Sequence, residues 1–455
     1  MASISSQNSL SILGAGLVGS LLSIYLRRRG YEVDIYERRP DLRRGGNYGG
    51  RSINLALSDR GFGGLNPVGI ADAIRSVGIP MYGRMMHDVD GKLTYQAYGK
   101  EGQCIYSVSR SGLNYKLMDL AEEEGVRLHF NLRCTDVDLQ QKQLHFEHND
   151  THQRMSAPYE RLFGTDGAFS ALRNSMMKTD RFDYSQDYLE HGYKELTIPA
   201  TADGGFAMEK NALHIWPRGH FMMIALPNPD GSFTCTLFFP YEGDPSFSKI
   251  KTPADLMAFF ETYFPDAIPL MPTLVEDYFA NPTPSLVTVR CFPWKYDDHA
   301  LLLGDAAHAI VPFYGQGMNC GFEDVRVFDE LFAKHGENWE GLFGEFQQLR
   351  KADGDAIADL AKANFIEMRD KVADAEFLLR KKIEARIHSR YPDTWIPLYT
   401  MVTFSPDIRY SDALRRGQYQ DRLMDGLMQQ GDWHRDFDSP ALDAAIDDMM
   451  THYQA

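Results

Sequence analysis

Cysteine is scarce in this chain, and the few cysteines are not spaced as in a known motif. Five cysteines stand far apart among 455 residues, and no two form a Cys-x-x-Cys pair. This pattern excludes a disulfide framework and a zinc site of paired thiolates, and it is typical of a reduced, cytoplasmic protein. His145 and His148 lie close in sequence, but no cysteine or carboxylate pair completes a ligand set, so we expect no bound metal.

Long apolar runs and excess positive charge are also missing. No window of about 18 apolar residues occurs, so we expect no membrane-spanning segment, and the first residues lack the basic-then-apolar order of a signal peptide. The formal net charge of −16 repels nucleic acid and anionic membranes, which excludes both as main partners. Hydrophobic residues make up 44% of the chain, which is enough for a real core in two or three structural units.

The chain begins with the pattern of a β-α-β unit. Residues 10–13 form a short apolar run that predicts a strand, and residues 16–29 carry apolar side chains at helical spacing, among them Leu21 and Ile24. A second strand is predicted over 32–36. Two strands joined by one helix run parallel, with a right-handed crossover.

The turn between the first strand and the helix has the glycine spacing of a dinucleotide-binding site. Gly14 permits the tight turn, Gly16 lets a pyrophosphate approach the backbone, and Gly19 lets the helix pack on the strand. The free N–H groups at the helix start, from Leu17 onward, favour phosphate binding. Glu37 follows the second strand, where a carboxylate accepts hydrogen bonds from the adenosine ribose. Only one such fingerprint is present.

The middle of the chain changes to the alternation that strands show. Apolar and polar residues alternate over 193–198, 212–216, 221–226 and 233–238, with turn signals between them. We therefore expect an antiparallel sheet inserted into the nucleotide-binding domain. From about residue 346 onward the sequence is helical and charged.

Two further motifs decide which dinucleotide binds. Residues 164–173 resemble the Asp-Gly motif of the flavoprotein aromatic hydroxylases, and residues 303–308 resemble their Gly-Asp motif. The resemblance implies FAD and an α/β fold like that of para-hydroxybenzoate hydroxylase, with a Rossmann-like FAD-binding domain, an inserted antiparallel substrate sheet and a C-terminal helical region. The FAD-binding domain is expected over 1–75, 101–180 and 291–345, the substrate sheet over 76–100 and 181–290, and the helical region over 346–455.

The resemblance also assigns cofactor residues. Asp305 would bind the ribityl chain, and Asp166 would lie near the pyrophosphate and the route of NADPH, which has no fold of its own here. The loop 312–321 enters a helix whose positive end would stabilise reduced flavin. The remaining candidates for FAD are Arg38, Arg39, Arg51, Ala56, Arg110, Gly304, Gly315, Gly317, Met318 and Asn319.

Longer stretches narrow the resemblance to the members of this family that hydroxylate L-kynurenine. They comprise residues 51–58, 191–196, 211–217, 315–320 and 399–405. This resemblance implies conversion of L-kynurenine to 3-hydroxykynurenine in tryptophan catabolism, with NADPH and dioxygen as co-substrates, through a flavin C4a-hydroperoxide.

The same resemblance assigns the substrate pocket. Arg84 would clamp the carboxylate, because the guanidinium fork binds a carboxylate through two hydrogen bonds, and Tyr98 would donate another. Asn364 and Tyr399 would complete the polar end. Leu213, Ile224 and Leu226 would form the wall for the aniline ring, Glu367 and Met368 would be pocket wall or helix packing, and Gln316, Phe313 and Pro312 would lie near the reacting face.

Some features depart from that pattern or leave alternatives open. Tyr314 stands where related enzymes carry histidine, which puts an imidazole-dependent step at the flavin in doubt. The last residues, 447–455, resemble soluble bacterial members rather than membrane-anchored ones, and a homodimer is left open.

Two other functions stay open: a hydroxylase of another aromatic acid, and a non-catalytic flavin-bearing interaction module. A halogenase is disfavoured, because 395–397 lacks the start of the Trp-x-Trp-x-Ile-Pro segment.

Overall fold

The chain folds around a parallel sheet that carries the predicted β-α-β unit. The computed structural model describes residues 9–44, 54–99, 102–368 and 375–453. Helix α1 (Leu17–Arg28) connects β1 and β2, which pair in parallel, and Gly30 with φ 91° follows the helix as the sequence predicts. The sheet order is β18-β19-β12-β1-β2-β8, with only β18 antiparallel. Its strands are β1 (Ser9–Leu13), β2 (Glu32–Tyr36), β8 (Arg127–His129), β12 (Arg161–Gly164), β18 (Lys295–Tyr296) and β19 (Ala300–Leu302).

A second, seven-stranded sheet forms the predicted insertion. Its order is β17-β13-β16-β15-β14-β5-β6. We expected an antiparallel sheet throughout, and this is wrong at one place: β5 and β14 run parallel, with Leu213 opposite Arg84. The strands are β5 (Gly83–His87), β6 (Leu93–Ala97), β13 (Asp183–Ile198), β14 (Ala212–Pro217), β15 (Met222–Pro227), β16 (Phe233–Pro240) and β17 (Ser285–Phe292).

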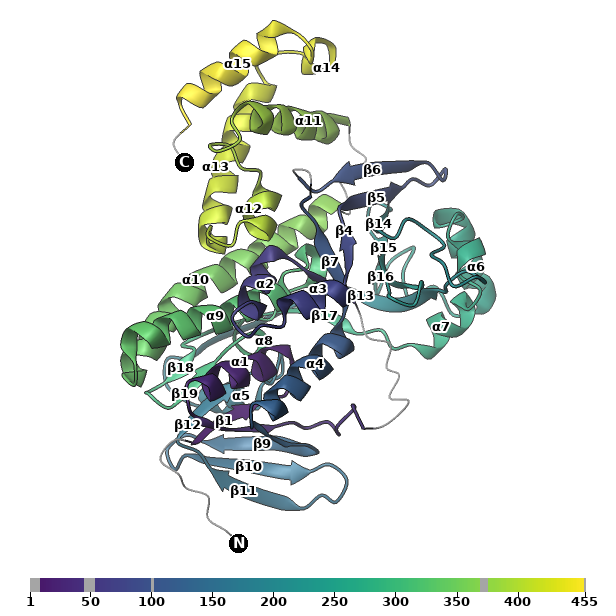
Figure 1. Ribbon diagram of the computed structural model, residues 1–455. Helices are drawn as coiled ribbons and strands as arrows, with labels where there is room; N and C mark the ends of the chain where they lie inside the picture. Colours follow the sequence, from purple (N-terminus) through teal and green to yellow (C-terminus); the bar gives the residue numbers. More distant parts are fainter. Residues whose placement is uncertain (1–8, 45–53, 100–101, 369–374, 454–455) are drawn as a thin grey trace.

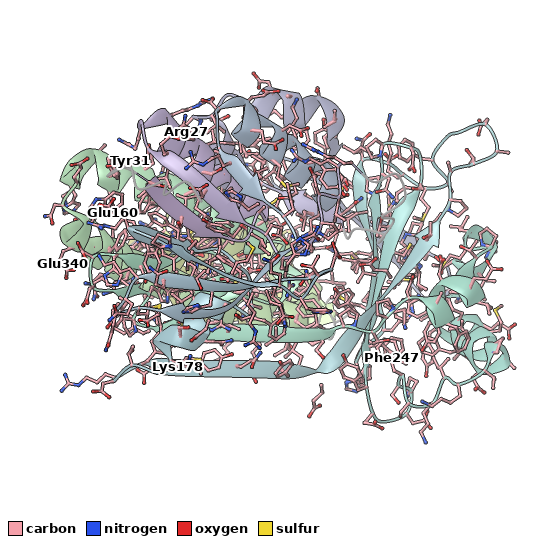
Figure 2. All side chains as sticks on the ribbon, turned by 90° about the horizontal axis from the view of Figure 1, so that it is seen from below. Arg27, Tyr31, Glu160, Lys178, Phe247 and Glu340 are labelled. Atoms are coloured by element: carbon pink, nitrogen blue, oxygen red, sulfur yellow. The ribbon has the colours of Figure 1, made fainter. Side chains whose placement is uncertain are left out.

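The two faces of this second sheet bury different cores. Trp216, Met223 and Phe239 pack with α6 (Pro253–Tyr263), η1 (Ile268–Leu270) and α7 (Leu274–Ala280) on one face. Figure 2 shows Phe247 on that side, at the opposite end of the molecule from Tyr31 and Glu340. Ile215 and Met222 face the other way, toward the loop that follows β19. The period of two along each strand therefore separates a structural face from a face available to the site.

Two small sheets and short helices complete the FAD-binding region. One sheet has the order β3-β7-β4 and the other β11-β10-β9. The strands are β3 (Asn54–Leu57), β4 (Ile79–Met81), β7 (Ile105–Ser109), β9 (Leu132–Asp138), β10 (Gln143–His148) and β11 (Arg154–Pro158). The helices are α2 (Asp59–Leu65), α3 (Ala71–Val77), α4 (Arg110–Glu123) and α5 (Ala171–Met176).

The C-terminal part is helical, as predicted, and its helices α11, α14 and α15 lie at the top of the view in Figure 1. The long helix α10 passes through position 345/346, where the sequence analysis places a domain boundary, so a continuous helix joins the two regions there. No helix in the described part of the chain is both long and apolar enough to cross a membrane. The helices are α8 (Asp305–His308), η2 (Pro312–Tyr314), α9 (Gly317–His335), α10 (Trp339–Ile366), α11 (Ala375–Arg390), α12 (Leu398–Phe404), α13 (Tyr410–Met428), α14 (Trp433–Asp436) and α15 (Pro440–Thr451).

Candidate active site

The backbone at the three glycines of the first turn has a geometry that agrees with their spacing. Gly14 has φ 94°, and a Cβ there would lie 2.7 Å from the carbonyl oxygen of Thr165. A Cβ on Gly19 would lie 2.1 Å from the carbonyl oxygen of Gly14, so only glycine lets α1 pack this closely. Around Gly16, by contrast, a Cβ would meet no atom within 4 Å. The backbone at Gly16 is thus open at the N-terminus of α1, where a diphosphate is best stabilised.

Glu37 lies beside this turn, immediately after β2. Its Oε2 accepts from the backbone N–H of Ala15 (2.9 Å), and its Oε1 accepts from the backbone N–H (3.0 Å) and Nε (2.8 Å) of Arg39. Burial opposes ionisation, but the hydrogen bonds and charge of Arg39 hold the pKa of Glu37 below its usual value. A buried, ionised carboxylate is therefore ready to accept from ribose hydroxyls.

The Asp-Gly motif closes one side of the same turn. Thr165 donates its hydroxyl to the carbonyl of Leu13 (2.8 Å), which ties β12 to the end of β1. Asp166 accepts from the backbone N–H of Ala171 (2.6 Å) through Oδ2, while its buried Oδ1 has no partner among the described residues. Burial raises the pKa of Asp166. This carboxylate has an unfilled hydrogen bond next to the predicted pyrophosphate site.

The Gly-Asp motif closes the other side. Gly304 has φ 58°, and a Cβ there would lie 3.0 Å from Cγ2 of Val18 in α1. A Cβ on Gly321 would lie 2.6 Å from the same methyl group. Asp305 is exposed at the start of α8. The three motifs, which span residues 14 to 308 of the sequence, thus meet around the first turn of α1, an arrangement that fits FAD.

The loop before α9 is shaped by internal hydrogen bonds. Gly315 has φ 66°. The amide nitrogen of Asn319 donates to the carbonyls of Ala56 (2.9 Å) and Gly315 (2.7 Å), and its Oδ1 accepts from the backbone N–H of Ser58 (3.0 Å). The side chain of Asn319 is therefore engaged in holding the loop on β3, so a role toward FAD would come from the first N–H groups of α9, which begins at Gly317.

The other predicted cofactor residues are more scattered. Met318 is buried in the core of the FAD-binding region. Arg38, Arg39 and Arg110 are exposed. Arg51 lies outside the described residues.

Five of the predicted substrate residues gather in one cluster. Tyr98 and Leu226 are buried together, and Ala56, Leu213, Ile224 and Tyr399 pack against them. Tyr98 and Tyr399 stack with ring centroids 5.2 Å apart. Four of these side chains come from the second sheet or its flank, one from β3 and one from α12, so the cluster lies where the FAD-binding region, the second sheet and the C-terminal helices meet.

Arg84 extends into this aromatic cluster from β5. Its guanidinium carbon lies 4.8 Å from the ring centroid of Tyr399 and 5.5 Å from that of Tyr98. Arg84 Nε and the hydroxyl of Tyr98 are buried and have no hydrogen-bond partner among the described residues. Burial raises the pKa of both Tyr98 and Tyr399, so both phenols stay protonated and able to donate. A guanidinium N–H and a phenol hydroxyl without partners, both in apolar surroundings, fit a carboxylate ligand.

The residues predicted near the reacting face form a second set of contacts. Phe313 stacks on Phe365 with centroids 4.0 Å apart. The amide nitrogen of Asn364 donates to the carbonyl of Phe313 (2.7 Å) and contacts Sδ of Met368 (3.2 Å), so α10 holds this loop. Gln316 is buried and accepts from the hydroxyl of Tyr410 (2.9 Å). Pro312 is exposed, and Glu367 lies 3.9 Å from Nζ of Lys381.

Comparison with known proteins places this geometry in a family. The family described as "FAD binding domain" matches residues 8–227 and 285–355. The kynurenine 3-monooxygenase of Flavobacterium johnsoniae is 48% identical over 441 residues, covering 97% of this chain and 98% of that protein. Those of Myxococcus xanthus (51% over 423 residues, 92% and 91%) and Dictyostelium discoideum (45% over 455 residues, 97% of each) are similarly close. The chain belongs to the kynurenine 3-monooxygenase family.

Solved structures of other oxygenases share the fold of this kynurenine 3-monooxygenase family member. A tetrameric form of 2-methyl-3-hydroxypyridine-5-carboxylic acid oxygenase aligns with TM-score 0.64 and 18% identity, over 85% of this chain and 98% of that one. PqsL of Pseudomonas aeruginosa, described as a probable FAD-dependent monooxygenase, aligns with TM-score 0.63 and 16% identity, over 81% and 99%. Both likenesses confirm the predicted fold class.

Several residues of the pocket are not predicted from the sequence. Tyr314 stacks on Tyr399 with ring centroids 5.6 Å apart. The sequence marks Tyr314 only as a position where related enzymes carry histidine. Met81, Ile105 and Phe404 complete the buried cluster. The alternation in 105–109 could have pointed to Ile105, but no local signal distinguishes a pocket-lining Met81 from an ordinary core methionine.

One cluster in the described part of the chain has ligand types that could suit a metal. The ligand atoms of His308, Cys320 and Asp324 lie within 4.8 Å of one another, and all three residues are buried. Arg350, however, donates Nε to Asp324 (2.7 Å) and Nη2 to Sγ of Cys320 (3.3 Å). A guanidinium already occupies the place of a cation, so this kynurenine 3-monooxygenase family member has a structural ion network there rather than a metal centre.

Proposed function

We propose that this chain is an FAD-dependent monooxygenase that hydroxylates L-kynurenine to 3-hydroxykynurenine, with NADPH and dioxygen as co-substrates. The observation that carries the proposal is Arg84, a partly buried cation beside two stacked phenol rings, whose buried Nε has no partner among the described residues. Kynurenine is an aromatic amino acid, so it offers both a carboxylate for Arg84 and a ring for the apolar wall. The names of the close relatives support the same substrate.

Three groups of FAD, the diphosphate, the adenosine ribose and the ribityl chain, each have residues that would hold them. The open backbone at Gly16 and the N-terminus of α1 would hold the diphosphate, and Glu37 would hold the adenosine ribose. Asp305 would bind the ribityl chain. The bound flavin would supply electron transfer from NADPH and the activation of dioxygen.

The substrate residues supply binding, orientation and exclusion of water. Arg84 and the protonated phenols of Tyr98 and Tyr399 fix the carboxylate end. Leu213, Ile224 and Leu226 hold the ring from one side and keep the pocket apolar. The amino group on the substrate ring donates electron density to the neighbouring carbon, so positioning rather than a strong base is the protein's main contribution, with a scale of about 7–11 kcal/mol for an ideal alignment.

A direct assay tests the proposal. The purified protein, loaded with FAD, is mixed with NADPH, dioxygen and either L-kynurenine, salicylate or 4-hydroxybenzoate, and products are identified by mass spectrometry. We expect kynurenine to accelerate NADPH oxidation and to gain one oxygen atom at the carbon beside the amine. Hydroxylation of only the other aromatic acids would refute the substrate, and a flavin-loaded protein that forms no product from any of them would refute the enzyme.

Replacement of Arg84 tests the carboxylate clamp. Arg84→Met removes charge-assisted hydrogen bonds of about 1.5–3 kcal/mol, so KM for L-kynurenine should rise roughly 10- to 150-fold, while the affinity for FAD stays unchanged. Kynuramine, which lacks the carboxylate, should not distinguish the variant from the parent. A matched control is Arg290→Met, on β17 of the same sheet, where Arg290 pairs with Asp355 and Asp359. An equal loss with kynuramine would show that Arg84 supports the pocket without binding the carboxylate.

Two expectations from the sequence remain predictions. The five cysteines are all free thiols, which supports a reducing, cytoplasmic location. Light scattering of the FAD-loaded protein measures whether it forms the homodimer that the sequence leaves open.

A further inference from the structure

Arg60 on α2 is a buried cation that the sequence analysis does not single out. Its side chain is 0% exposed. It donates to the carbonyl oxygens of Met401 (3.2 Å), Val402 (3.1 Å), Ser405 (3.1 Å) and Ile408 (2.7 Å). These carbonyls belong to the C-terminal end of α12 and the turn after it, where a helix has unsatisfied acceptors and a negative dipole end. Arg60 therefore caps the helix that carries Tyr399.

The same guanidinium begins a chain of buried ion pairs. Arg60 Nη1 donates to Oε1 of Glu323 (2.5 Å), and Arg350 Nη1 donates to Oε2 of the same carboxylate (2.7 Å). Arg350 Nε then donates to Oδ1 of Asp324 (2.7 Å). All four side chains are at most 3% exposed, so each charge depends on its neighbours in this chain for compensation.

The far end of this series of ion pairs contacts the predicted flavin turn. Asp324 Oδ2 accepts from the backbone N–H of Gly304 (3.0 Å) and from Nε2 of His308 (2.6 Å). Gly304 immediately precedes α8, which begins at Asp305 and ends at His308. One carboxylate thus fixes both ends of the short segment that presents Asp305.

A second contact ties the same C-terminal segment to the loop near the reacting face. Tyr410, whose ring lies 4.1 Å from the guanidinium carbon of Arg60, donates its hydroxyl to Gln316 at the start of α9. Asp353 on α10 accepts from Arg350 (3.1 Å), Arg409 (3.1 Å) and Ser411 (2.8 Å). The polar network is therefore continuous between α9, α10 and the start of α13.

We propose that Arg60, Glu323, Arg350 and Asp324 form a strut that fixes the substrate helix α12 at one end and the Gly304–Asp305 flavin turn at the other. Each of the four is a positioning residue that acts through Tyr399 or Asp305. The assignment of the two ends to substrate and FAD rests on the proposed function. The four residues hold these two parts of the fold at a set separation whichever ligands bind there.

The strut predicts that damage at each end has a different consequence. Arg60→Met should loosen α12, so amide hydrogen exchange over Leu398–Phe404 should accelerate at least about tenfold. L-kynurenine should bind at least about tenfold more weakly, and the Kd for FAD should change less than about threefold. Asp324→Asn should show the reverse, with a Kd for FAD raised at least about tenfold and exchange in α12 changed less than about threefold. Glu323→Gln, in the middle, should produce both effects.

The measurements use the full chain loaded with FAD. Exchange is followed by mass spectrometry, FAD affinity by flavin fluorescence, and kynurenine affinity by the change in flavin absorbance. Arg386→Met is the matched control, because Arg386 pairs with Asp443 and the carbonyl of Phe437 in the C-terminal helices without contacting α12. It should leave all three readouts unchanged.

The results separate this inference from the proposed function. If kynurenine is not the substrate, exchange in α12 and the Kd for FAD still report on the strut. Should Arg60→Met fail to fold, Arg60→Lys keeps the charge but offers too few donors for four carbonyls and a carboxylate, so it should accelerate exchange in α12 alone. The strut is refuted if Arg60 and Asp324 variants show the same pattern, or if Glu323→Gln leaves both ends unaffected.

Discussion

At the scale of single residues, the position of Glu37 after the second strand predicts a ribose contact, and its ionised carboxylate makes that contact measurable. Its carboxylate is ionised although buried, since Arg39 and the N–H of Ala15 hydrogen-bond to it. The charge is therefore maintained by neighbours on both sides of the nucleotide turn. A neutral side chain of the same shape would keep the packing and lose the charge.

Glu37→Gln should accordingly weaken FAD binding. A hydrogen bond to a charged acceptor contributes about 1.5–3 kcal/mol, so we expect the Kd for FAD to rise roughly 10- to 150-fold in a fluorescence titration. Asp34→Asn is the control: Asp34 lies on the same strand and pairs with Arg127 and His129, so its loss should lower stability but leave the affinity for FAD unaltered. Equal weakening in both variants would contradict a ribose contact by Glu37.

The residues that sequence reasoning identifies and those that it misses differ in a physical way. Gly14, Gly19 and Glu37 follow from local spacing, because a turn and the two elements around it are short-range structures. Arg84, Tyr98 and Tyr399 follow from the family resemblance, and the structure brings them together. Arg60 follows from neither, because its partners lie 263 to 348 residues further along the chain.

At the scale of elements, β14 and β15 each divide their side chains between two cores. Leu213, Ile215 and Ile224 face the pocket side, while Trp216 and Met223 pack against α6 and α7. The alternation is visible in the sequence and predicts the strands correctly. The parallel pairing of β5 with β14 is not, because a period of two fixes which side chains share a face but not which distant strand lies alongside, or in which direction.

This division predicts opposite effects for neighbouring residues. Ile224→Ala should raise KM for kynurenine and increase the share of NADPH oxidised without hydroxylation, because the ring loses one wall. Met223→Ala, one residue earlier and fully buried on the other face, should lower the free energy of unfolding by about 2–5 kcal/mol while KM stays near that of the parent. Steady-state kinetics and urea unfolding of both variants provide the check; a larger KM effect for Met223→Ala would reverse the assigned faces.

At the scale of the whole molecule, the buried His214 couples stability to pH. His87 lies between Asp266 (2.8 Å) and His214 (2.8 Å), and His214 Nε2 donates to the carbonyl of Glu209 (2.8 Å). Burial lowers the pKa of His214 to about 4. The unfolded chain, with an ordinary histidine pKa near 6.5, binds a proton that the folded chain excludes.

Stability should therefore be complete above about pH 6.5 and fall as the pH decreases toward 4, by up to about 3 kcal/mol from this group. In His214→Gln, which can still donate to Glu209, the free energy of unfolding should change less over that interval. Urea unfolding at steps from pH 7 to pH 4 measures the slope, with His434→Gln, an exposed position, as the control. A slope unchanged in His214→Gln would assign the acid sensitivity to other groups.

The long sequence separation between Arg60 and its carbonyl partners also affects folding during synthesis. The guanidinium leaves the ribosome 342 residues before the carbonyl of Val402 that it will bind, a delay of roughly 20–70 s at ordinary rates of translation. During that interval the nascent N-terminal half keeps a hydrated cation at a position that must later become dry. A chain that ends before α12 lacks these carbonyl acceptors, so the charge of Arg60 would stay in contact with water there.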